Sequence, residues 1–141
     1  MRKRVKKALC IIFVLCVLTS SLGAAAQNAP APSIQAIQAT RICAITAGLT
    51  ITTSGYATCT SSLDMVYSTD TATLYMYLQR QNGSSWETVN SWTTSGSYYI
   101  AQTANTYVTK GTYRVYAVGY VYTDGVLVDS SSIYSYPATY K

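Results

Sequence analysis

Side chains able to carry out catalysis are scarce in this 141-residue chain. It contains no histidine, so it lacks the usual general base at neutral pH and the commonest metal ligand. Two converging carboxylates could still form a glycosidase-type pair, but turn and strand positions explain the five acids better: Asp64, Asp70, Glu87, Asp124 and Asp129. We therefore predict no catalytic residue, no metal site, no cofactor and no enzymatic activity, with a carboxylate pair as the alternative.

The first 26 residues have the three-part pattern of a secretory signal peptide. Five basic residues among the first seven positions precede an apolar run over 8–18, and small residues then end in an A-x-A pattern. The run is too short for the roughly 20 residues that span a bilayer. We interpret 1–26 as a cleaved signal peptide and 27–37 as a short leader, and we predict a secreted protein without a membrane span.

The formal charge of +5 belongs to this signal. From Gln27 onward the five acids are matched by five basic residues, which are Arg41, Arg80, Lys110, Arg114 and Lys141. The part that remains after cleavage therefore carries no net charge, which argues against nucleic acid or anionic membranes as partners.

The four cysteines divide in the same way. Cys10 and Cys16 leave with the signal, whereas Cys43 and Cys59 remain as an even pair in an exported chain. Such a pair predicts a disulfide, which would stabilise the domain by roughly 3 kcal/mol. The bond could join neighbouring strands or bridge two sheets, and two free buried thiols are the alternative.

From about residue 38 the chain alternates between apolar and polar residues at period two, which is typical of half-buried strands. We expect strands over 43–52, 56–62, 71–81, 86–93, 98–103, 112–122 and 126–136. Asn82-Gly83 and Asp124-Gly125 predict hairpins, and Pro137 is expected to end the sheet because it cannot donate to a ladder.

About seven strands with frequent turns predict an immunoglobulin-like antiparallel β-sandwich over 38–141, and a small β-barrel is the alternative. Tyr113, at the start of the 112–122 strand, is predicted to be buried as a tyrosine corner.

Four motifs occur together and in order: Gly55-Tyr56-Ala57-Thr58-Cys59, Leu78-Gln79-Arg80, Asn82-Gly83-Ser84-Ser85-Trp86 and Lys110-Gly111-Thr112-Tyr113-Arg114. With them the chain resembles, from about Arg41 to Tyr140, an uncharacterised family of small secreted proteins of Gram-positive, clostridia-like bacteria. The last motif is similar to the penultimate strand of immunoglobulin-like and fibronectin type III-like domains. The resemblance implies secretion and a β-sandwich, and it implies no activity.

The unusual feature of the composition is its 14 tyrosines and two tryptophans. Alternation predicts a contiguous outward patch on two neighbouring strands, formed by Tyr75 and Tyr77 on one and Tyr116, Tyr120 and Tyr122 on the other, with Arg114 at its margin. Large patches of this type mark interaction sites, although cross-strand tyrosine pairs can also serve only to stabilise a sheet.

Trp86 and Trp92 are an even number of residues apart and are expected to share a face. They form a secondary candidate site, although at least one is expected to seal the core. We predict a secreted, non-catalytic binding or adhesion-type module for an unknown protein or glycan. The alternative is a structural protein that associates with its own copies, which a flat, uncharged edge strand would favour.

Overall fold

The computed structural model describes residues 40–141, and the predicted signal peptide and leader lie outside the described residues. The described part contains eight strands: β1 (Ile42–Ile51), β2 (Tyr56–Met65), β3 (Thr71–Asn82), β4 (Ser85–Ser97), β5 (Tyr99–Tyr107), β6 (Gly111–Thr123), β7 (Val126–Tyr134) and β8 (Ala138–Tyr140). None of its segments is a helix long and apolar enough to cross a bilayer.

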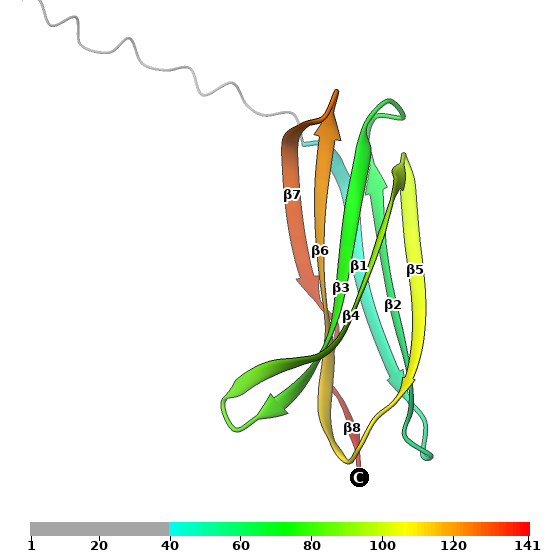
Figure 1. Ribbon diagram of the computed structural model, residues 1–141, viewed down its shortest axis with the longest axis vertical. Helices are drawn as coiled ribbons and strands as arrows, with labels where there is room; N and C mark the ends of the chain where they lie inside the picture. Colours follow the sequence, from blue (N-terminus) through cyan, green and yellow to red (C-terminus); the bar gives the residue numbers. More distant parts are fainter. Residues whose placement is uncertain (1–39) are drawn as a thin grey trace, which may run out of the picture. The chain divides into compact units, whose positions relative to one another are not determined.

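The strands form two antiparallel sheets, in the orders β1-β2-β5 and β4-β3-β6-β7, and β8 also pairs with β6 (Figure 1). The sheets do not close into a barrel. This is the arrangement of an immunoglobulin-like β-sandwich, so the fold prediction is confirmed.

The core follows from period-two alternation on the central strands. Along β3 and β6 every second residue is buried, and the two strands pair over Thr71–Arg80, as predicted. The largest fully buried side chains come from both sheets: Leu63, Met65, Leu74, Met76, Leu78, Val115 and Val121. The residues of β3 and β6 that lie between these buried ones therefore point to the outer side of the five-stranded sheet.

Tyr113 is the tyrosine corner that the sequence predicts. Its side chain is only 2% exposed, and its hydroxyl donates a 2.9 Å hydrogen bond to the carbonyl of Thr109, four residues upstream. A buried hydrogen bond of this kind contributes about 1 kcal/mol. It fixes the segment 108–110, which carries the chain from one sheet to the other.

Both predicted hairpins are present, with a difference in one turn. Asp124 and Gly125 both have positive φ, as a type I′ turn requires. In the other hairpin Asn82 pairs with Ser85, and Gly83 has a φ of 60°. The central residues are therefore Gly83 and Ser84 in a type II′ turn, one position later than the Asn-Gly signal predicts.

A β-bulge interrupts three of the four edge strands. The unpaired extra residues are Cys43 in β1, Val89 in β4 and Val128 in β7. Bulges bend an edge strand and blunt its tendency to pair with other chains. Figure 1 shows the end of the β3–β4 hairpin turning away from the body of the sandwich, beyond the bulge at Val89.

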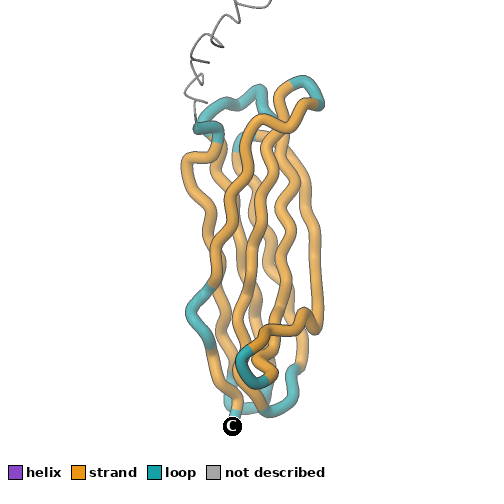
Figure 2. The backbone as a smooth tube through the Cα atoms, turned by 90° about the vertical axis from the view of Figure 1, so that its left-hand side faces the viewer, coloured by secondary structure: helices purple, strands orange, loops and turns teal. Residues whose placement is uncertain are grey.

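The prediction that Pro137 ends the sheet is wrong. After an interruption over 135–137, β8 continues the same edge and pairs with Gly111–Tyr113 of β6, which Figure 2 shows as a short loop before the last strand. Ser135 secures the interruption, because its amide donates to the Val115 carbonyl and its Oγ accepts from the Val115 amide. Pro137 lies between two strands, so no ladder hydrogen bond is lost.

Candidate binding face

Four of the five predicted face tyrosines contact one another on the outer side of the five-stranded sheet. Their ring centroids are 6.4 Å apart for Tyr75–Tyr77, 5.9 Å for Tyr75–Tyr120 and 6.0 Å for Tyr77–Tyr116. The contacts follow from register, since Tyr77 lies directly opposite Tyr116. All four side chains are half-buried, because each ring is partly covered by its neighbours.

Arg114 extends this cluster across the sheet. Its guanidinium lies between two aromatic rings, 4.2 Å from the centroid of Trp86 and 3.9 Å from that of Tyr134. The Tyr134 ring in turn stacks on Tyr116 at 4.5 Å. We define the tyrosine face as the seven side chains in this continuous chain of contacts: Tyr75, Tyr77, Tyr116, Tyr120, Tyr134, Arg114 and Trp86.

The prediction that Trp86 and Trp92 share a face is wrong. Trp86 lies opposite Gln81, on the outer side, whereas Trp92 lies opposite Met76 and packs against the core. The bulge at Val89 adds one residue between them and so reverses the alternation. Trp92 has the core role expected for one of the pair, and Trp86 belongs to the main face.

Tyr122 lies apart from these contacts. It is opposite Thr71 and lines a shallow depression together with residues of β3 and β4, which are Thr71, Ala72, Thr73, Ser95, Gly96 and Ser97. Its place on the outer side is as predicted, but within the described part of the chain no ring pairs with it.

Two members of the arrangement are missing from the sequence prediction. Gln79 accepts a 2.9 Å hydrogen bond at Oε1 from Nε of Arg114. Tyr134 is half-exposed, and its ring lies against the guanidinium of Arg114. A plain hairpin register from Asp124-Gly125 would place Ile133 opposite Tyr116. The bulge at Val128 shifts the register by one residue and places Tyr134 there. Alternation alone could have placed Gln79 on the outer side, because it lies two residues after Tyr77 on β3.

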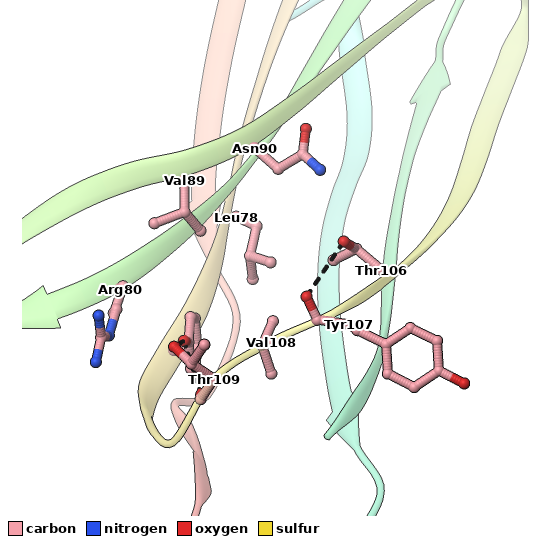
Figure 3. A pocket seen from close by; sticks show the side chains of 9 residues that line it. Leu78, Arg80, Val89, Asn90, Thr106, Tyr107, Val108 and Thr109 are labelled. Carbon is pink, nitrogen blue, oxygen red and sulfur yellow. Dashed lines mark hydrogen bonds between the residues drawn. The ribbon is translucent and has the colours of Figure 1, made fainter. Parts of the chain in front are cut away.

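A separate pocket of about 200 Å³ lies between the β3–β4 hairpin and the segment 106–109 (Figure 3). Leu78, Val89 and Val108 contribute its apolar lining, and the guanidinium of Arg80 donates to the Lys110 carbonyl at 3.0 Å. Figure 3 shows the ring of Tyr107 turned away from the pocket. The lining contains no carboxylate and no thiol, so it supplies no acid–base pair or nucleophile of that kind.

The predicted Cys43–Cys59 disulfide is absent, and both cysteines are free. Cys59 lies opposite Leu49, six residues along β1 from Cys43, which corresponds to about 20 Å. A disulfide needs Cα atoms within about 7 Å. The alternative of two buried thiols holds only for Cys59, because the bulge turns Cys43 to the exposed side. Residues 40–141 also contain no group of three or more acids and cysteines that could hold a metal ion.

We expect the two thiols to differ sharply in reactivity. Burial raises the pKa of Cys59 to about 11, and thiolates are the reactive form. Iodoacetamide at pH 8 should therefore label Cys43 in the native protein and Cys59 only after denaturation, as read by peptide mass spectrometry. Labelling of both at equal rates in the native protein would contradict the buried position of Cys59.

Stability should also fall at alkaline pH. In the unfolded chain the Cys59 thiol has a pKa near 9.0, so it loses its proton at a lower pH than in the folded protein. Unfolding is therefore favoured as the pH rises from about 9 towards about 11. The expected contribution is a loss of about 1 kcal/mol between pH 8 and pH 10. A Cys59→Ala variant should lack this part of the slope in urea titrations at each pH, and identical slopes would contradict the prediction.

No protein-family model matches the chain, and no curated protein matches it either. The resemblance to a family of secreted bacterial proteins therefore stays a prediction.

Proposed function

We propose that the domain is a secreted, non-catalytic binding module whose protein or glycan partner contacts the tyrosine face. The observation that carries this proposal is the continuous cluster of six aromatic side chains and one arginine across β3, β4, β6 and β7. Tyrosine, tryptophan and arginine give large contact areas at low entropic cost, and they are enriched where proteins bind partners. The predicted signal peptide supports secretion.

Sheet stabilisation alone accounts for only part of the cluster. Pairs such as Tyr77–Tyr116 would each contribute about 0.2–1 kcal/mol without any ligand. That account covers Tyr134 only in part, because its ring pairs with Tyr116 across the strands yet stays 50% exposed on an edge strand. It does not extend to a charged Arg114 held between two rings. These two residues favour recognition.

Self-association is the second candidate, and one observation favours it. The edge strand β5 of the three-stranded sheet contains no bulge, no charged residue and no proline. Uncharged edges are the type that pair with strands of other copies.

The test is a triple variant, Tyr77→Ser, Tyr116→Ser and Tyr120→Ser, screened against glycans and extracellular proteins. We expect partner binding to be lost while far-UV circular dichroism shows an intact fold. The matched control replaces three tyrosines of the other sheet with serine, namely Tyr56, Tyr99 and Tyr107. Binding that persists in the folded triple variant would contradict the proposal.

Sedimentation velocity distinguishes self-association from the binding of another protein or a glycan. Association that survives the triple variant but is lost on Thr103→Lys, in the middle of β5, would assign self-pairing to that edge.

A further inference from the structure

The charge of Arg114 is not balanced by any acid of the tyrosine face. The single ion pair among residues 40–141 joins Arg41 to Asp70. The other acids are placed elsewhere: Asp129 accepts from the amides of Arg41 and Ile42, Glu87 accepts from Asn82, Asp64 lies on β2 of the other sheet, and Asp124 forms the β6–β7 turn. An anionic group brought by a ligand would therefore meet an unpaired cation.

The hydrogen-bond donors of Arg114 are also only partly used. Nε donates to Gln79, whereas within the described residues the two terminal nitrogens have no hydrogen-bond acceptor. The rings of Trp86 and Tyr134 hold the guanidinium in one orientation. A fixed planar fork with free N–H groups matches the two oxygens of a carboxylate, because both oxygens can accept at once.

The backbone of this face favours a sugar chain over a peptide. β3 and β6 are paired on both sides, so their amides and carbonyls are already used. Peptides that bind to sheets usually add as a strand at a free edge. The centre of the tyrosine face instead offers ring surfaces and phenolic hydroxyls, which suit the C–H faces and hydroxyls of sugar rings.

We propose that the tyrosine face binds an acidic polysaccharide and that Arg114 is the residue that binds its carboxylates. This inference rests on the proposed function and specifies its ligand class. The selected ligands are polymers of uronic acids, whose sugar rings lie over the tyrosines while a carboxylate pairs with the guanidinium. Neutral polymers of the same shape lack that pair and bind more weakly.

The experiment compares polygalacturonate with its fully methyl-esterified form, in affinity electrophoresis at pH 7 and physiological salt. We expect the wild-type domain to bind the acid polymer at least ten times more tightly than the ester. Arg114→Gln should reduce binding of the acid polymer to the level of the ester. Arg114→Lys keeps the charge but loses the planar fork, so its affinity should lie between the two.

Arg80→Gln is the matched control, because it removes the same charge from an exposed position on β3 outside the tyrosine face. An equal loss in both variants would overturn the inference in favour of general charge attraction. Equal binding of acid and ester, unchanged by Arg114→Gln, would overturn it while the proposed function stands.

Two further outcomes separate the proposals. If neither polymer binds but the triple tyrosine variant loses a protein partner, the ligand class is wrong and the face is right. If no binding of any kind depends on the tyrosines, both proposals fail.

Discussion

Replacing Asp70 with alanine should lower the free energy of unfolding by about 2–3 kcal/mol. Its side chain is fully buried, with Oδ2 3.3 Å from Nη1 of Arg41 and Oδ1 accepting a 2.7 Å hydrogen bond from the hydroxyl of Thr123. The substitution leaves both donors unpaired. Because Arg41 is 29% exposed, water compensates part of its loss, so the expected cost is below that of a fully buried pair.

Urea denaturation of purified variants measures this effect. Asp70→Asn keeps the shape of the side chain and should cost less, which separates the ionic part from the hydrogen bonds. Asp64→Ala is the control, since Asp64 is half-buried on β2 outside this network, and it should change stability by less than about 0.5 kcal/mol. An Asp70→Ala variant as stable as the control would show that the network contributes nothing.

Replacing Leu63 with alanine should cost about 3 kcal/mol, because Leu63 is fully buried in the centre of one core cluster. Its partner in the opposite sheet is Gly119. A Cβ atom at Gly119 would lie only 3.0 Å from both terminal methyl carbons of Leu63, so Gly119→Ala alone should overpack the core and cost about 1–2 kcal/mol.

The double variant Leu63→Ala, Gly119→Ala should be more stable than the sum of the single costs predicts, by at least about 0.5 kcal/mol, because the new methyl group enters the space that Leu63 leaves. Leu78→Ala combined with Gly119→Ala is the control cycle, since Leu78 belongs to the other core cluster, and its costs should add. If the Leu63 cycle is also additive, the two residues do not share a packing space.

The alternation of apolar and polar residues is sufficient to define the central strands of this domain. β3 and β6 have a paired strand on each side and the other sheet against one face, so a slip of one residue would move Leu74, Met76 and Val115 to the outer side. The hydrophobic effect therefore fixes their register strongly, and alternation alone predicts the outward position of Tyr75, Tyr77, Tyr116 and Tyr120. The tyrosine corner at Tyr113 follows from the same pattern.

The register of the edge strands, in contrast, depends on packing that alternation does not reveal. An edge strand is paired on one side only, so an inserted residue costs few hydrogen bonds, and packing and twist determine where it occurs. The bulge at Cys43 turns its thiol to the exposed side, the bulge at Val89 separates Trp86 from Trp92, and the bulge at Val128 brings Tyr134 over Arg114. Each bulge reverses the local alternation of inward and outward residues, and the residue types at these positions do not indicate that a bulge is present. The aromatic enclosure of Arg114 therefore depends on edge geometry, whereas the tyrosines beneath it follow from the sequence.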